Sequence, residues 1–297
     1  MTATSVSAGL SATATVTVTA PATPLPPSGV YVHQPVDYVE FAENSLSGLP
    51  GTNLGTVIGG WYSQGANLTI VSDPTAPRSP SAVLQFRFPG GTQVGSGIGL
   101  LEGWQYGAGN VPVQYREFYE SGWFKIPSAD FETPGPGMKL LGYWGVGQYE
   151  SGKAGNQIYG VLPGNYSNTS LMSSWKLDIR QQNNVNRSMS ANRSTKLIRA
   201  GMWQHYEIQM VLNDVDVPNG ILRVWLDNGD GSGLTLTHEY TDVMYRTSAA
   251  KSADGIDSRS GFYSRRWDPI WGGMGGNAKT RTDYLWVDHI YISGKPM

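Results

Sequence analysis

Short stretches in which hydrophobic and polar residues alternate recur along most of the chain. In the stretch 81–89, Leu84, Phe86 and Phe88 occupy alternate positions, with polar residues among those between them. Alternation with a period of two over about four to eight residues predicts a strand with one buried face. The same reasoning predicts strands at 116–126, 139–146, 173–182, 203–212, 220–227 and 283–293. Because no stretch has the pattern of a long amphipathic helix, the sequence predicts an all-β fold.

The composition agrees with short strands joined by many turns. The 297 residues include 38 Gly, 18 Pro, 16 Tyr and 10 Trp. Only 15% of the residues are charged, whereas about 25% is usual in globular proteins. Few charges together with many aromatic, glycine and proline residues favour a sandwich or a barrel, and a chain of this length can form one large all-β domain.

The first part of the chain differs in composition from the rest. Residues 1–19 alternate small apolar residues with Thr and Ser, which predicts a β-strand tail, and this tail resembles the end of a bacterial Ig-like (group 2) domain. Residues 20–29 are rich in proline and predict an extended linker. Residues 30–297 show no second change of composition, so we interpret them as one domain. A lone strand has open edges, so we expect the tail to add to a sheet of its own chain or of a neighbour. Self-assembly through this strand is therefore a further hypothesis.

Charge, cysteine content and hydrophobicity narrow the set of partners. A net charge of −2 offers little attraction to nucleic acid, whose binding depends on cationic side chains. The absence of cysteine excludes disulfides and thiolate metal sites. No apolar run reaches the length of about 18 residues that a membrane span needs, so no membrane insertion is expected. The first residues also lack the basic and apolar regions of a signal peptide.

Three segments resemble one known family. They are "YESGWFKIPSADFETPGPGMKLLGYWG" (119–145), "GMWQHYEIQMVLN…NGILRVWLDN" (201–228) and "IDSRSGFYSRRWDPIWGGMGGNAKTRTDYLWVDHIYISG" (256–294). In their strands, turns and glycines they resemble the concanavalin A-like jelly-roll lyases that cleave alginate and glucuronan. The chain departs from the GGKLPGL pattern of that family at Met138 and Leu141. The resemblance implies an all-β, concanavalin A-like jelly-roll sandwich of two antiparallel sheets. It implies a polysaccharide as the partner.

A lyase of this kind needs groups that neutralise a uronate carboxylate, remove a proton and protonate the leaving oxygen. Lys139 and its neighbours are implied by the family motif, and the other candidates follow from alternation along the strands. Lys139 could equally be a solvated lysine, Arg180 could pair with an acid on a neighbouring strand, and His205 could be structural. The candidate catalytic residues are Lys139, Tyr143, Arg180, His205 and Tyr263. The candidate substrate-binding residues are Gln182, Arg265, Trp104, Trp144 and Trp267, of which Trp104 and Trp267 are expected to be exposed.

Other catalytic schemes find less support. A glucanase of this fold would show two acids in E-x-D-x-x-E spacing on one strand, and no such motif occurs. Neither G-x-S-x-G nor H-E-x-x-H is present. The sequence "DNGDGSG" (227–233) is interpreted as a hairpin turn rather than a calcium loop. "KAGNQ" (153–157) echoes a motif of another lyase group but is assigned to a loop. No metal and no cofactor are expected.

Three functions remain open. A glycan-binding or adhesion module comes first, because a surface with aromatic residues is predicted while the catalytic set is incomplete. A polysaccharide lyase acting by β-elimination is the alternative, and a structural subunit of a virion or surface assembly is the third. All three favour an extracellular or surface location. We expect Lys139, Tyr143 and Arg180 to line one shared surface, and their placement on opposite sheets would contradict this site.

Overall fold

The computed structural model consists of β-strands, turns and irregular segments, and it contains no helix among the residues that it describes. The chain divides into two compact units, Met1–Val30 and Tyr31–Met297. Nothing in the described part of the chain has the length and hydrophobicity of a membrane-spanning helix. The described residues are 2–7, 10–15, 53–54, 61–64, 67–78, 80, 83–98, 100–103, 116–132, 137–146, 156–162, 177–182, 187–247, 262–272 and 276–293.

The first unit contains a two-stranded antiparallel sheet. Strand β1 (Thr2–Ser7) pairs with β2 (Leu10–Thr15) in a register that begins at Thr2 opposite Thr15 and ends at Ser7 opposite Leu10. The alternation over residues 2–19 therefore corresponds to two strands that pair with each other, rather than to one. Addition of these strands to another sheet stays a prediction.

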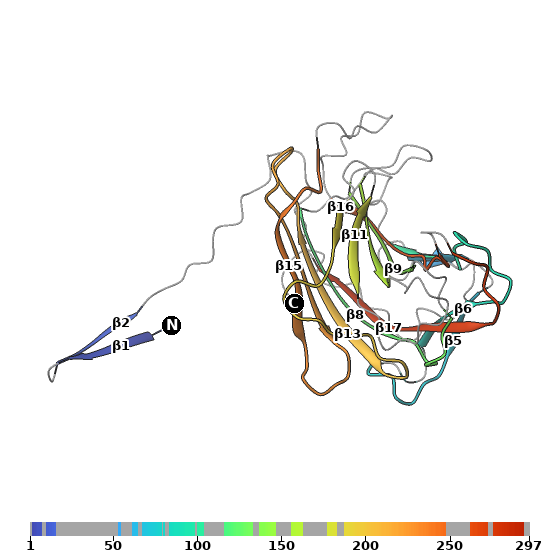
Figure 1. Ribbon diagram of the computed structural model, residues 1–297, viewed down its shortest axis with the longest axis horizontal. Coiled ribbons are helices and arrows are strands. Elements are labelled where there is room, and N and C mark those ends of the chain that lie inside the picture. The colour runs from blue at the N-terminus through green and yellow to red at the C-terminus, as the bar shows by residue number, and fades with distance from the viewer. Residues whose placement is uncertain are drawn as a thin grey trace. The chain divides into compact units, whose positions relative to one another are not determined.

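The second unit is built from two antiparallel sheets (Figure 1). The eight-stranded sheet has the order β12–β11–β10–β9–β16–β7–β4–β3. Its strands are β3 (Asn53–Leu54), β4 (Trp61–Gln64), β7 (Leu100–Gly103), β9 (Met138–Val146), β10 (Asn156–Leu162), β11 (Asp178–Gln182), β12 (Arg187–Met189) and β16 (Phe262–Trp267).

The seven-stranded sheet has the order β15–β14–β13–β8–β17–β6–β5. Its strands are β5 (Leu68–Val71), β6 (Val83–Phe88), β8 (Glu117–Lys125), β13 (Trp203–Val211), β14 (Gly220–Asp227), β15 (Thr235–Val243) and β17 (Asp283–Ser293). The prediction of an all-β sandwich of two antiparallel sheets is confirmed. Alternation located β6, β13 and β14 to within a few residues, since every second residue along one face of each strand is buried.

The hydrophobic core lies between the two sheets. The ring of Trp267, from the eight-stranded sheet, lies 6.3 Å from that of Phe86 and 6.4 Å from that of Tyr206, both in the seven-stranded sheet. All three side chains are fully buried. Aromatic rings at these separations add to the stability that their burial alone provides.

A buried carboxylate connects the two sheets within this core. Glu120 of β8 has no exposed surface. It accepts a hydrogen bond from Trp144 Nε1 of the eight-stranded sheet at 2.7 Å and one from the Tyr206 hydroxyl at 2.5 Å. Gly122 allows this contact, because a Cβ there would lie 2.8 Å from the Tyr206 oxygen. Burial of a carboxylate is costly unless it is hydrogen-bonded, so these donors are needed to keep Glu120 inside.

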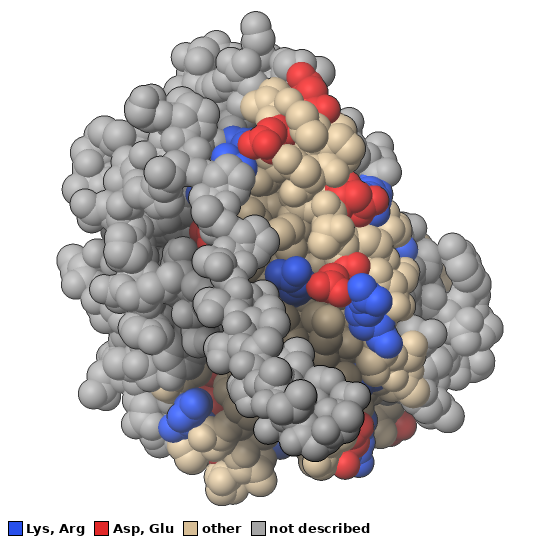
Figure 2. Space-filling view, turned by 90° about the vertical axis from the view of Figure 1, so that its left-hand side faces the viewer, with Lys and Arg blue, Asp and Glu red and all other residues tan. Residues whose placement is uncertain are grey.

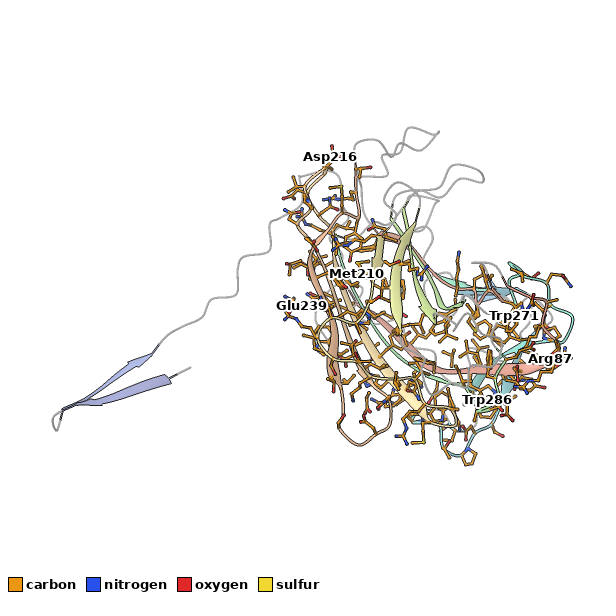
Figure 3. All side chains as sticks on the ribbon, in the orientation of Figure 1. Arg87, Met210, Asp216, Glu239, Trp271 and Trp286 are labelled. Atoms are coloured by element: carbon orange, nitrogen blue, oxygen red, sulfur yellow. The ribbon has the colours of Figure 1, made fainter. Side chains whose placement is uncertain are left out.

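A second buried charge lies on the outer face of the seven-stranded sheet. Lys125 Nζ donates to Asp73 Oδ2 at 2.7 Å, and Trp203 Nε1 donates to the same oxygen at 3.1 Å. The ammonium also lies 5.2 Å from the ring of Trp286, which Figure 3 labels. Burial acts to raise the pKa of Asp73, but the hydrogen bonds from Lys125 and Thr75 outweigh it and lower this pKa to about 2.

Replacement of Glu120 by alanine is expected to destabilise the sandwich strongly. Trp144 Nε1 and the Tyr206 hydroxyl would both lose a buried acceptor, and each such loss costs about 1–3 kcal/mol. We expect the free energy of unfolding in urea to fall by about 3 kcal/mol or more. Glu117→Ala is the matched control, because Glu117 lies on the same strand, is partly exposed and accepts one bond from Tyr119. Equal losses in the two variants would contradict a special role for Glu120.

Acid should weaken the fold through Asp73. Its folded pKa of about 2 lies below the unfolded value near 3.8, so its contribution is complete above pH 4 and is lost as the pH falls toward 2. A difference of about two pH units corresponds to about 2–3 kcal/mol. In Asp73→Asn, the free energy of unfolding should be lower at neutral pH and should fall less steeply between pH 4 and 2. Asp130→Asn, at an exposed position, is the control. If the free energy of unfolding fell equally between pH 4 and 2 in the natural chain and in both variants, this account would be refuted.

Candidate functional site

The two faces of the eight-stranded sheet are distinguished by residues of β11 and β12. Ile179 and Met189 are cross-strand partners and are both fully buried in the core. The next pair, Arg180 and Ser188, therefore lies on the opposite, outer face, where Arg180 is partly exposed and Ser188 is exposed. This outer face is the candidate site.

A continuous row of residues crosses the outer face. Cross-strand partners in an antiparallel sheet share one face, and the registers connect one partner to the next over seven strands. We call this set the polar row. In order from β4 to β12 it consists of Tyr62, Glu102, Arg266, Tyr143, Tyr159, Arg180 and Ser188.

Two shorter rows flank the polar row on the same face. One contains Ser264, Gly145, Gln157 and Gln182. The other contains Lys139, Val161 and Asp178. The registers thus bring Lys139, Tyr143 and Arg180 to one face of one sheet, as we predicted, with β10 between the two strands that carry them. Their assignment as catalytic residues stays a prediction.

An irregularity in β9 keeps Lys139 and Tyr143 on the same face. Tyr143 pairs with Tyr159 and Lys139 with Val161, so three residues of β9 lie opposite the single residue Gly160. Gly142 makes this possible by adopting a φ of 72°, a conformation that glycine reaches without strain. A Cβ at Gly160 would lie 2.9 Å from the Cβ of Leu141. The bulge adds two residues, an even number, so alternation is the same on both sides of it.

Arg180 is a cation without a partner among the described residues. Its side chain is partly exposed, and its Nε is buried and donates no hydrogen bond within the described structure. The arginines over β14 and β15 behave differently. Arg193 and Arg223 contact Glu239 at 2.6 Å and 2.9 Å, and Figure 2 shows charges of both signs side by side on the face that it views. Buried donors are normally satisfied, so Arg180 is suited to receive an anionic ligand.

Lys139 is buried rather than solvated. Only 8% of its surface is exposed, which contradicts the alternative of a solvated lysine on a strand face. Burial lowers the pKa of its ammonium, and the negative charge of Asp268 acts in the opposite direction. The sequence alone did not indicate Asp268, because the residue lies on an irregular segment far from Lys139 in the chain.

Two predicted sugar-binding tryptophans belong to the core instead. Trp267 is fully buried between the sheets, and Trp144 is 1% exposed with its Nε1 bonded to Glu120. The predictions that they contact substrate, and that Trp267 is exposed, are therefore wrong. Their strands present alternate residues to the outer face, and the aromatic side chains fall on the apolar side. Trp104 lies outside the described residues.

His205 lies on the other sheet. It belongs to β13, where its ring stacks on Trp123 with centroids 4.3 Å apart and its Nε2 lies 2.8 Å from Ser121 Oγ. Burial lowers the pKa of His205 to about 4; Asp227 counteracts this and Arg78 adds to it. His205 is therefore neutral near pH 7 and cannot act together with Lys139 and Arg180. The alternative of a structural histidine is the one that the structure supports.

The register of β16 changes the choice of arginine. Arg265 pairs with Trp144, whose side chain lies in the core, while Arg266 pairs with Tyr143. Arg266 rather than Arg265 therefore belongs to the polar row. The reason is a register shift between Phe262 and Ser264, which leaves Tyr263 without a cross-strand partner and resets the alternation. A single-sequence pattern gives no sign of this shift.

Sequence reasoning missed the strand that carries Tyr159. The segment around "KAGNQ" was assigned to a loop, but Asn156–Leu162 forms β10, in the middle of the site. Gln157 and Tyr159 alternate with Ile158 and Gly160, so a period of two was present over a short stretch. Gln182, which we predicted to bind substrate, is the cross-strand partner of Gln157.

The glycine-rich turn after β14 binds the ammonium group of Lys196. Lys196 Nζ donates to Ser232 Oγ at 2.6 Å and to the Gly233 carbonyl at 2.8 Å, and it lies 3.4 Å from Asp230 Oδ1. This lysine thus compensates the negative charge of Asp230 within the turn. In the described part of the chain, no group of three or more His, Cys, Asp or Glu side chains is arranged to hold a metal.

Comparison with known proteins agrees with the fold. No protein-family model matches the sequence, and no curated protein sequence matches it. A PL-14 alginate lyase from Aplysia kurodai superposes with a TM-score of 0.55 at 11% identity, over 78% of this chain and 89% of that chain. An endo-β-1,4-glucuronan lyase from the fungus Trichoderma reesei superposes with a TM-score of 0.51 at 11% identity, over 78% and 90%. The chain thus has the concanavalin A-like jelly-roll fold that the sequence resemblance implied, shared with lyases that act on alginate and glucuronan.

Proposed function

We propose that this protein binds an acidic polysaccharide along the outer face of its eight-stranded sheet. The observation that carries the proposal is Arg180, whose buried Nε has no partner within the described structure. A guanidinium forms short, paired hydrogen bonds with a carboxylate, and every residue of a uronate polymer carries one. Arg266 lies in the same polar row and adds a second positive charge.

The extent of the polar row fits a polymer rather than a single sugar. It crosses seven strands, and strands lie about 4.8 Å apart, so the row is about 29 Å long. It contains three tyrosines, two arginines and one glutamate. Tyrosine rings pack against the apolar faces of sugars, while the glutamines of the flanking row are suited to hydroxyl groups. We place this binding outside the cell or at a cell or virion surface, where such polymers occur, in a module that serves binding or adhesion.

Cleavage of the same polymer by β-elimination is the second candidate. Tyr143 and Tyr159 are adjacent in the polar row, between Arg266 and Arg180. In this reaction a base removes the proton at C5, the C4–oxygen bond breaks, a C4–C5 double bond forms and the leaving oxygen takes a proton. Arginine next to the carboxylate would stabilise the charge that develops, and a tyrosine could transfer each proton. The similar folds of an alginate lyase and a glucuronan lyase support this candidate.

Binding should depend on Arg180. Arg180→Gln removes the charge that would meet a carboxylate, and a charge-assisted hydrogen bond contributes about 1.5–3 kcal/mol, so the Kd for alginate or glucuronan should rise about ten- to hundredfold. Arg87→Gln is the matched control, because Arg87 is an exposed strand residue of the other sheet, labelled in Figure 3. Calorimetric titration at low and high salt, with a neutral polymer for comparison, measures the effect. Failure of the natural chain to bind either acidic polymer would overturn the proposal.

Cleavage is tested separately by following the ultraviolet absorbance of an unsaturated uronate. If the protein is a lyase, Tyr143→Phe or Tyr159→Phe should lower kcat about 10²-fold, because proton transfer typically accelerates a reaction by 10²–10⁴, and should leave Kd within a few fold. Binding without any rise in absorbance would leave the binding function and exclude cleavage of the polymers tried.

A further inference from the structure

The segment that follows β16 is hydrogen-bonded through its backbone between β9 and residues 96–98. Ile270 N donates to the Lys139 carbonyl at 3.0 Å, and Ile98 N donates to the Pro269 carbonyl at 3.0 Å. Trp271 N donates to the Ser96 carbonyl at 3.1 Å. The side chain of Trp271 is fully buried, as is that of Trp267 before the segment. Residues 268–271 are therefore held rigidly beside the backbone of Lys139.

The carboxylate of Asp268 lies in a space that only glycine leaves open. A Cβ at Gly97 would lie 2.7 Å from Asp268 Oδ1, closer than side-chain carbons approach oxygens. The φ of Gly97 is not positive, so its backbone does not itself require glycine. Glycine at position 97 thus leaves the room that the Asp268 carboxylate needs.

Lys139 needs a negative charge nearby. Its side chain is almost completely buried, and a buried ammonium favours the neutral form unless an anion compensates it. Among the described residues, the negative charge of Asp268 raises the pKa of Lys139 and so favours its charged form. Neighbouring titratable positions on the sheet are Asp178, two strands away in the same row, and Tyr143 and Arg266 in the polar row.

We propose that Asp268 is a positioning residue, which Gly97 admits and which holds Lys139 as a charged ammonium on the outer face beside the polar row. The purpose of this arrangement rests on the proposed function, because a charged lysine there serves to attract the carboxylates of an acidic polymer. The electrostatic effect of Asp268 on Lys139 does not depend on that function.

The pairing is tested without any polymer. The full chain is labelled with ¹³C at lysine Cε, the Lys139 signal is assigned from Lys139→Arg, and its titration midpoint is measured by NMR. Asp268→Asn should lower the midpoint by about one to two pH units, the usual size of the effect of one adjacent opposite charge. Gly97→Ala should lower it as well, because the new methyl group displaces the carboxylate while the core stays intact. Asp268→Glu, which restores the charge, should return the midpoint toward that of the natural chain.

Asp242→Asn is the control for the loss of a charge, because Asp242 pairs with Arg187 at an exposed site. It should leave the Lys139 midpoint unchanged. Unchanged midpoints in both Asp268→Asn and Gly97→Ala, with native tryptophan fluorescence, would overturn the inference. If the midpoints shift as expected and the natural chain binds no acidic polymer, the pairing stands and the proposed function fails. If both hold, polymer binding by Asp268→Asn should weaken at a lower pH than binding by the natural chain.

Discussion

The contact of Trp144 with Glu120 fixes the arrangement on which the outer face depends. Glu120 is buried between the sheets, and it accepts one hydrogen bond from the indole of Trp144 and one from Tyr206. A buried carboxylate requires these donors, so Trp144 has to point inward. Because neighbouring positions of a strand belong to opposite faces, position 143 then belongs to the outer face, and the registers of β10 and β16 align Tyr159 and Arg266 with it.

The fold could be predicted from the sequence because most strands have one apolar face. The alternation in β13 and β14 is strict and corresponds to the buried positions seen in the structure. The closing segment, in which Leu285, Val287 and Ile290 are buried, also resembled its family counterpart. Burial therefore dictates the pattern wherever a strand is long and regular.

The site was harder to predict, because its residues can be chosen only if the core face and the outer face of the eight-stranded sheet are told apart. Alternation groups Trp144 and Trp267 correctly with their neighbours, but it cannot tell an aromatic residue in the core from one on a binding surface. The register shift in β16 resets the alternation, so Arg265 was chosen where Arg266 belongs. The interaction of Asp268 with Lys139 joins residues more than a hundred positions apart, and no local pattern records it.

The bulge in β9 restricts how this strand can change in length. Lys139 and Tyr143 share a face because the bulge contributes two extra residues opposite Gly160. Deletion or insertion of one residue here would exchange the two faces on one side of the bulge, turning either Lys139 into the core or Trp144 out of it. Changes of two residues would preserve both. The strand can therefore gain or lose residues at this point only in pairs, a rule that homologous chains should obey in their lengths even where their sequences have diverged.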